Sequence, residues 1–179
     1  MINIETEYKF LVNKIPKVFN NVYNITQSYF ILNDITKAEI KKIFTILNND
    51  DFELINTYRI RMVSCNNITK YIITLKTKGL NSRKEYEEEI TKEQYDLFYK
   101  YSSKTIIKNR YVVEYNNYVF EFDEYFNLVE NIITCEVETE IEDVNYNNIT
   151  NIFKNYFHIE FQDVTNEKKY KNKYLQIKN

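Results

Sequence analysis

Charged side chains recur at every second residue in several segments of the chain, and most of these sets carry a single sign. The first set is Glu5, Glu7 and Lys9. The later sets are Arg59 and Arg61; Lys76 and Lys78; Arg83, Glu85, Glu87 and Glu89; Lys108 and Arg110; Glu121 and Asp123; and Glu136, Glu138 and Glu140. Because residues two apart point to the same side of a β-strand, each segment is predicted to be a strand with one charged face.

These charged faces have two explanations. For any one strand, a solvated face of an antiparallel sheet is the simpler one. Taken together, the strands favour a binding site, because basic and acidic residues are sorted onto different strands, whereas solvated faces would mix them. Arg and Lys on one wall can bind a triphosphate, and carboxylates on another can hold Mg²⁺ or Mn²⁺, which bridge to phosphate oxygens. The pattern therefore predicts metal-dependent chemistry on a triphosphate.

The elements that carry these residues can be read from the spacing of apolar side chains. Alternating polarity predicts eight strands, at 2–12, 26–33, 55–64, 69–78, 82–90, 104–115, 117–124 and 132–142. Apolar residues three or four apart predict helices at 36–48, 91–101 and 145–157, and a last polar helix is expected to begin near Asn166. Thr91 and Gln94 have the spacing of a capping box. The order predicts an α+β fold in which eight antiparallel strands close a barrel, with the charged walls facing each other across a wet lumen and the helices packed outside.

Composition narrows the class of protein. A length of 179 residues fits one domain spanning 1–179. The 24 basic and 26 acidic residues nearly balance, so no global field attracts nucleic acid or a membrane. Cys65 and Cys135 are far apart and argue against a zinc site or a disulfide framework. No apolar run approaches the ~20 residues needed to span a bilayer, so a cytoplasmic protein is expected. With one Gly and one Pro, the turns are expected to use Asn.

The sequence resembles the CYTH superfamily, the triphosphate tunnel metalloenzymes. IETEYKFLV is similar to the ExExK signature of that family, a motif that is weak alone because alternating charge is common in strands. Further motifs follow in the family's order over nearly the whole chain. They are QSYF, YRIR, ITLKTKG, SRKEYEEEI, IIKNRY, FEFDEY, CEVE and the closing segment DVTNEKKYKN. The resemblance implies an eight-stranded antiparallel tunnel.

The resemblance also implies roles for the charged residues. The implied phosphate-binding side chains are Lys9, Arg59, Arg61, Lys76, Arg83, Lys108, Arg110 and Lys169. The implied ligands of two divalent cations, Mg²⁺ or Mn²⁺, are Glu5, Glu7, Glu121, Asp123, Glu136 and Glu138, with Glu85 and Glu87 as accessory residues. Lys9 and Tyr29 resemble a pair found in hydrolytic members, so they and the first two glutamates are the candidate catalytic residues.

Two departures from the family pattern stand out. Lys169 occupies a position where the family usually has Arg, which replaces a two-pronged phosphate contact by a point charge. The 34–54 insertion, with its helix, is longer than in small bacterial members and could cap one mouth of the tunnel.

Three functions remain compatible with the sequence. The favoured one is hydrolysis of the terminal phosphate of inorganic triphosphate or a similar small triphosphate. A class IV adenylyl cyclase, which forms cyclic AMP and pyrophosphate from ATP, is the second, although no pocket for adenine is recognisable. A non-catalytic polyphosphate- or nucleotide-binding module is the third, and it could lose the acidic wall that is present here. Thiamine triphosphate is a further candidate substrate, nucleic acid is not expected, and a homodimer is left open.

Overall fold

The computed structural model describes residues 8–45, 47, 49–78, 84–139 and 146–178. The chain divides into two compact units. Among the described residues, the first unit comprises those from 25 to 105, and the second comprises 8–24, 106–139 and 146–178. Each unit has its own apolar core. The prediction of a single domain over 1–179 stays a prediction.

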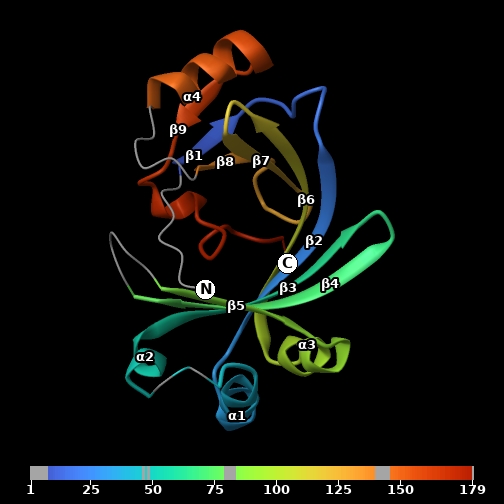
Figure 1. Cartoon of the computed structure of the whole chain (residues 1–179), viewed down its shortest axis with the longest axis vertical. Coiled ribbons are helices and arrows are strands. Elements are labelled where there is room, and N and C mark those ends of the chain that lie inside the picture. The colour runs from blue at the N-terminus through green and yellow to red at the C-terminus, as the bar shows by residue number, and fades with distance from the viewer. Residues whose placement is uncertain (1–7, 46, 48, 79–83, 140–145, 179) are drawn as a thin grey trace. The chain divides into compact units, whose positions relative to one another are not determined.

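The described residues form nine antiparallel strands, hydrogen-bonded in the order β5-β4-β3-β2-β6-β7-β8-β1-β9 (Figure 1). Their bounds are β1 Tyr8–Val12, β2 Asn21–Phe30, β3 Ile55–Cys65, β4 Ile68–Thr77, β5 Glu85–Ile90, β6 Ser102–Tyr115, β7 Tyr118–Tyr125, β8 Ile133–Thr139 and β9 Phe161–Asp163. Strands combined with helices confirm the α+β class. Within the described residues, the order ends at β5 and β9, and hydrogen bonds do not close it. The prediction of eight strands missed β9, because three residues are too few to show alternation.

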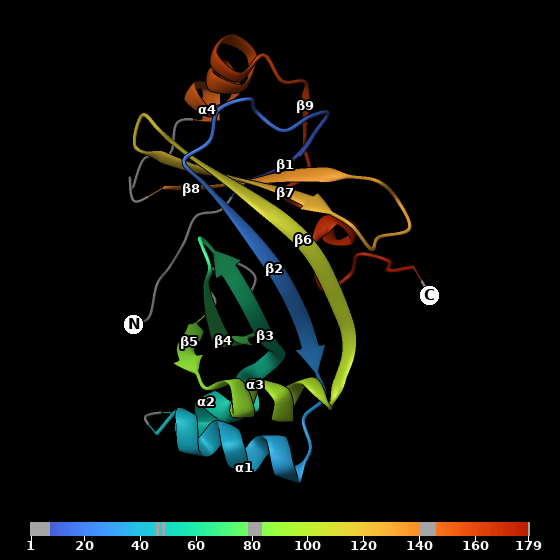
Figure 2. The same ribbon diagram turned by 90° about the vertical axis from the view of Figure 1, so that its right-hand side faces the viewer.

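The core of the first unit lies between strands β3 to β5 and three helices, α1 Asp34–Ile43, α2 Asn49–Leu54 and α3 Lys92–Tyr99. Figures 1 and 2 show all three helices on one side of these strands. Ile60 of β3 and Ile73 of β4 are paired and fully buried there, and Phe98 of α3 belongs to the same core. Arg59 and Arg61 flank Ile60 in sequence, so the strand's alternation directs them to the face opposite the helices. The predicted placement of the helices on the apolar side of the strands is therefore confirmed for this unit.

The core of the second unit is aromatic. Phe10, Phe120, Phe122 and Phe153 are fully buried and pack mostly edge to face. Phe153 begins a π-helical turn, Phe153–Phe157, that continues α4, Tyr146–Ile152. Figure 2 shows α4 beside β1, β7 and β8. The apolar residues of these strands therefore face this helical segment and leave the alternate positions for charged side chains.

The helix ends explain which predictions held. The capping box of Thr91 and Gln94 is present at α3, and Asn33 caps α1 in the same way. The short α2 was not predicted, because its sequence NDDFEL has the Asn/Asp content of a loop. The helix expected near Asn166 was wrong: one 3₁₀ turn, Lys168–Tyr170, forms there, because the sequence has no apolar stripe to bury. In the part of the chain that the structure describes, no helix has the length and apolarity to cross a membrane.

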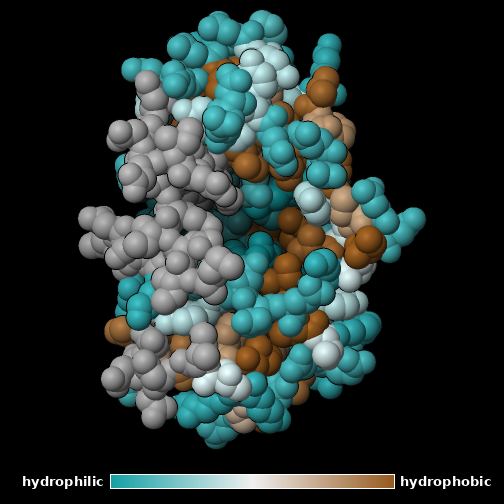
Figure 3. Space-filling view, viewed as in Figure 1, coloured by the Kyte–Doolittle hydropathy of each residue, from teal (hydrophilic) through white to brown (hydrophobic). Residues whose placement is uncertain are grey.

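The outer surface of the helices in the first unit is polar. On the face shown in Figure 3, the described surface at the lower edge, over the helices of the first unit, is largely hydrophilic. Charged side chains of α1 and α3 contribute to this, because Lys42 and both members of the Lys92–Asp96 pair are exposed. An exposed pair such as Lys92–Asp96 contributes little to stability, so the helices are held mainly by their buried sides.

Asn residues form the tight turns, as the sequence predicted. Asn66 and Asn67 join β3 to β4, and Asn116 and Asn117 join β6 to β7, with φ between 49° and 65°. Two successive left-handed residues are the signature of a type I′ turn. Asn117→Val is expected to lower the free energy of unfolding by roughly 1–2 kcal/mol, because a β-branched residue is strained at positive φ. Asn117→Gly should leave stability equal or higher. Urea denaturation measures both, and an unchanged midpoint in the Val variant contradicts the turn assignment.

Candidate functional site

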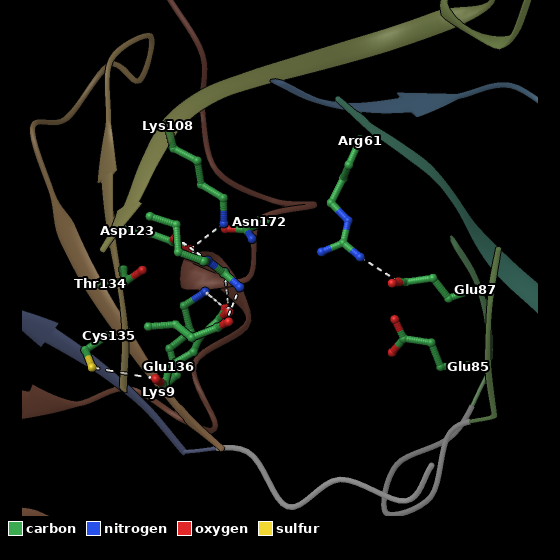
Figure 4. Close-up of polar contacts among 12 residues, drawn as sticks. Lys9, Arg61, Glu85, Glu87, Lys108, Asp123, Thr134, Cys135, Glu136 and Asn172 are labelled. Carbon is green, nitrogen blue, oxygen red and sulfur yellow. Dashed lines mark hydrogen bonds and ion pairs between the residues drawn. The ribbon is translucent and has the colours of Figure 1, made fainter. Parts of the chain in front are cut away.

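The charged strand faces form two clusters, one in each unit (Figure 4). The basic cluster, in the first unit, consists of Arg59, Arg61, Thr74, Lys76, Glu85 and Glu87 on β3, β4 and β5. The buried cluster, in the second unit, consists of Lys9, Lys108, Arg110, Glu121, Asp123 and Glu136 on β1, β6, β7 and β8.

In the basic cluster, cations and carboxylates are linked across three strands. Arg59 Nη2 lies 3.3 Å from Glu85 Oε1, and Lys76 Nζ lies 2.5 Å from the other oxygen of Glu85. Arg61 Nη2 lies 2.5 Å from Glu87 Oε2. Burial acts to raise the pKa of Glu85, but the charges of Lys76 and Arg59 outweigh it, so this pKa falls below its ordinary value. Glu85 is therefore ionised at neutral pH and helps to fix the cations in place.

The basic cluster retains positive charge. Three cations face two carboxylates among its described members, which leaves a formal charge of +1. The Arg59 side chain is only 12% exposed, and its Nε is a buried donor with no hydrogen-bond partner in the described part of the chain. An unsatisfied buried N–H on a cation is unfavourable unless an acceptor binds there. The arrangement suits an added anion.

The buried cluster is held by strand register. Arg110 stands opposite Asp123, and Glu136 stands opposite both Glu121 and Lys9. Arg110 grips Asp123 with two hydrogen bonds, from Nε at 2.7 Å and from Nη2 at 2.8 Å, and also contacts Glu121. Its Nη2 also lies 2.9 Å from Glu136 Oε2, while Lys9 Nζ lies 2.7 Å from Glu136 Oε1. Four strands therefore bring these charges into one network.

Burial sets the electrostatics of this cluster. The side chains of Lys108 and Asp123 are 1% and 0% exposed, and they form an ion pair. Burial, followed by the charge of Arg110, lowers the pKa of Lys108 to about 8. Burial acts to raise the pKa values of Asp123 and Glu136, but neighbouring cations outweigh it, mainly Arg110 for the first and Lys9 for the second, and both pKa values are lowered. Apolar residues could often replace a buried ion pair without loss of stability, so a contribution to stability does not by itself account for this network.

These pKa directions predict acid sensitivity. The unfolded pKa values of Asp123 and Glu136 are 3.8 and 4.5, and the folded values are lower, so the unfolded state binds more protons in between. The stabilisation from both carboxylates is therefore present above pH 4.5 and is lost as the pH falls through the folded pKa values. Urea midpoints are expected to fall steadily as the pH is lowered below 4.5. The decline should be shallower for Glu136→Gln, and an identical slope contradicts the assignment.

The sequence predicted separate basic and acidic walls, and inside each unit this is wrong. Arg61 contacts Glu87 in the first unit, and Lys108 contacts Asp123 in the second. The charges are sorted by strand, as the spacing showed, but neighbouring strands of opposite sign lie side by side and pair. Pairing reduces the cost of bringing so many charges together.

The remaining predicted site residues are described one by one. Tyr29 belongs to the first unit, where its hydroxyl accepts a hydrogen bond from Gln27 Nε2 at 2.9 Å. Lys169 is 69% exposed and pairs with Glu167 in the second unit. Glu138 lies on β8 with its backbone opposite Val119. Glu5, Glu7 and Arg83 lie outside the described residues.

The carboxylates offer donors of the right chemistry for a hard cation. Mg²⁺ and Mn²⁺ prefer oxygen ligands, and Glu121, Asp123 and Glu136 supply them within one network. In the described residues their oxygens contact Lys and Arg, and no group of three or more acidic, His or Cys side chains is placed around one ion position. The carboxylate oxygens are therefore suitable ligands for such a cation by their chemistry, and in this structure they are engaged in ion pairs with Lys and Arg.

Sequence patterns missed neutral residues in the basic cluster and beside the buried cluster. Thr74 is buried and accepts from Arg59 Nη2 at 3.1 Å while it donates to Glu87 at 2.9 Å. It lies two residues before Lys76, so the period of two could have found it, but a neutral side chain does not stand out. Next to Lys108, the buried Tyr125 hydroxyl donates to Asn172 at 2.7 Å. Asn172 comes from the closing segment, and only the tertiary structure brings it there.

Comparison with known proteins identifies the fold. No family model and no curated protein sequence matches the chain. Among solved structures, the hypothetical protein NE1496 is 22% identical, covers 95% of both chains and gives a TM-score of 0.54. HpAC1 from Hippeastrum, a proposed adenylyl cyclase with a dominant triphosphatase activity, is 14% identical over 88% of this chain and 90% of its own, with a TM-score of 0.55. The chain has the CYTH fold.

A third CYTH-like structure agrees with this result. A proposed adenylate cyclase from Bacillus halodurans, bh2851, is 14% identical over 86% of this chain and 89% of its own, with a TM-score of 0.52. At these identities the comparisons establish the CYTH fold and leave the reaction to be argued from the residues. The resemblance first seen in ExExK and the later motifs is confirmed at the level of that fold.

Proposed function

We propose that this protein hydrolyses the terminal phosphate of inorganic triphosphate or a similar small triphosphate. The observation that carries the proposal is the buried cluster, six charged side chains on four strands of a CYTH fold. Charges are buried at such density where they bind or act on another charged group, because their burial is unfavourable for folding alone. HpAC1, which shares the fold, is described with a dominant triphosphatase activity, and this supports the reaction class.

Cations of each cluster would bind phosphate oxygens of the substrate. The proposal includes the closed eight-stranded tunnel that the sequence resemblance implies. Arg59, Arg61 and Lys76 would bind phosphate oxygens, and Lys108 and Arg110 would bind others once their carboxylate partners turn to a cation. Lys9 would stabilise charge on the leaving phosphate, and Tyr29 would orient the attacking water. Lys169 would contribute an outer positive charge.

Divalent cations complete the proposal. Mg²⁺ or Mn²⁺, in two sites, would be held by carboxylates of β7 and β8 together with Glu5 and Glu7. The proposed ligands are Glu5, Glu7, Glu121, Asp123, Glu136 and Glu138, with Glu85 and Glu87 accessory. Such ions neutralise phosphate charge and polarise the bond that breaks. The carboxylates that now pair with Lys and Arg would be freed as the phosphate oxygens take over those cations.

ATP turnover separates hydrolysis from cyclisation. Incubation with ATP and Mn²⁺, followed by analysis of the products, should give orthophosphate and ADP if the terminal phosphate is hydrolysed. Pyrophosphate with cyclic AMP would instead support the adenylyl cyclase, which bh2851 makes the leading alternative. Glu7→Gln serves as the control, because loss of a proposed ligand should abolish either reaction. Product formation at the wild-type rate in this variant contradicts the proposed site.

A further inference from the structure

The backbone of Lys9 is held by residues that follow β9. The register of β1 with β9 ends at Phe10 opposite Asp163, so it pairs Lys9 with no residue of β9. The Lys9 amide instead donates to Thr165 Oγ1 at 3.0 Å, and its carbonyl accepts from the Val164 amide at 2.9 Å. The Thr165 side chain thus supplies the acceptor for the Lys9 amide at the point where the pairing of β1 with β9 ends.

Thr165 is itself fixed by a carboxylate. Asp163 Oδ1 accepts from the Thr165 amide at 2.9 Å and from the Thr165 hydroxyl at 2.7 Å. A hydroxyl has one proton to donate. When the Thr165 hydroxyl donates it in a hydrogen bond to Asp163, the lone pairs of the hydroxyl oxygen point towards the Lys9 amide. The alternative acceptor for that proton, the Lys9 carbonyl, is farther away at 3.4 Å. We call the hydrogen-bonded set of Asp163, Thr165 and Lys9 the Thr165 clamp.

The clamp acts on the residue that enters the buried cluster. On its other side β1 pairs with β8, and Lys9 stands opposite Glu136, with its ammonium 2.7 Å from Oε1. Lys9 is therefore fixed at its backbone from the β9 side and at its side chain from the β8 side. Its side chain is only 6% exposed, so it can move little unless the backbone moves.

We propose that Thr165 is a positioning residue for Lys9. The inference rests on the proposed function, in which the Lys9 ammonium contacts a phosphate. The hydroxyl of Thr165 fixes the position of the Lys9 backbone. It thereby sets the distance from the Lys9 ammonium to the phosphate oxygen that this ammonium would contact. It gives a role to the closing segment DVTNEKKYKN, whose resemblance to the CYTH pattern assigned none to Thr165.

Kinetics of three variants test the proposal. Thr165→Val keeps the shape and removes the hydroxyl, and it is expected to lower kcat/KM for tripolyphosphate roughly tenfold, because small misplacements of a reacting group are costly. Thr165→Ser restores the hydroxyl and should return kcat/KM to within about twofold of wild type. Thr150→Val is the matched control, since Thr150 also bonds to a backbone carbonyl, but within α4. Wild-type kinetics in a folded Thr165→Val protein overturn the proposal.

A double-mutant cycle separates positioning from general weakening. The dissociation constant for tripolyphosphate is measured by calorimetry in wild type, Thr165→Val, Lys9→Gln and the double variant. If the clamp acts through Lys9, Thr165→Val should weaken binding severalfold in wild type and less than about twofold in the Lys9→Gln background. Equal losses in both backgrounds indicate a merely structural role and overturn the proposal.

Hydrogen exchange tests the clamp without substrate. The Lys9 amide should exchange at least about tenfold faster in Thr165→Val than in wild type, because its acceptor is gone, and Thr165→Ser should protect it again. Unchanged exchange overturns the clamp. If wild type neither binds nor cleaves tripolyphosphate while exchange responds as expected, the proposed function fails and the clamp on Lys9 stands. The two failures are therefore distinguishable.

Discussion

Asp123→Asn is expected to lower the free energy of unfolding by about 3–5 kcal/mol, a large fraction of the stability of a protein of this size. Asp123 is fully buried and pairs with both Lys108 and Arg110. The amide keeps the shape of the side chain and removes its charge, so two buried cations lose their shared partner. The pKa of Lys108, about 8 with Asp123 in place, is then expected to fall further, so Lys108 sheds its proton more readily and the loss is limited. Urea denaturation at pH 7 measures the change.

Glu89→Gln is the matched control for this variant. Glu89 also pairs with a lysine, Lys70, at 3.0 Å, but both side chains are more than half exposed. Exposed pairs are worth about 0–1 kcal/mol, so this variant should unfold almost as wild type does. If Asp123→Asn lowers the free energy of unfolding no more than Glu89→Gln does, the charge of Asp123 does not stabilise the buried cluster as argued.

Arg59→Met is expected to raise the dissociation constant for tripolyphosphate roughly 10- to 100-fold, the range for a lost hydrogen bond to a charged group. The variant removes one of three cations in the basic cluster and leaves Glu85 and Glu87 in place, so the formal charge of its described members falls from +1 to 0. The buried Nε donor disappears as well. Calorimetric titration without metal measures this loss directly.

Two further variants serve as controls for the binding measurement on Arg59→Met. Lys70→Met removes a cation from the same sheet, but one that is 57% exposed and pairs only with Glu89 among the described residues, and it should bind as wild type does. Arg59→Lys keeps the charge and loses the planar fork, so an intermediate affinity is expected. Binding by Arg59→Met equal to that of Lys70→Met, in folded protein, contradicts a phosphate-binding role for the basic cluster.

Local patterns were sufficient to predict most elements and the charged residues of both clusters. The period of two located Arg59, Arg61, Lys108 and Arg110 on strand faces, because alternation in a strand is fixed by the backbone. The capping box at Thr91 was equally local, and the Asn turns followed from the scarcity of Gly and Pro. The CYTH fold was recognised because the motifs kept their order along the chain.

What the sequence could not predict depends on contacts between distant segments. Spacing alone does not say which strand lies beside which, so the pairing of Arg110 with three carboxylates could not be foreseen. β9 and the Thr165 clamp form only because residues after α4 return to β1. The roles proposed for Glu5, Glu7 and Arg83 stay predictions, as they lie outside the described residues.

The most direct test is to follow tripolyphosphate by phosphorus NMR in the presence of the purified protein and Mg²⁺, Mn²⁺ or Co²⁺ in turn. Orthophosphate and pyrophosphate are expected to appear in equal amounts with at least one of these metals, and neither should form after a chelator is added. Tripolyphosphate that stays intact with all three metals, in protein shown to be folded, would contradict the proposal that this chain hydrolyses triphosphates.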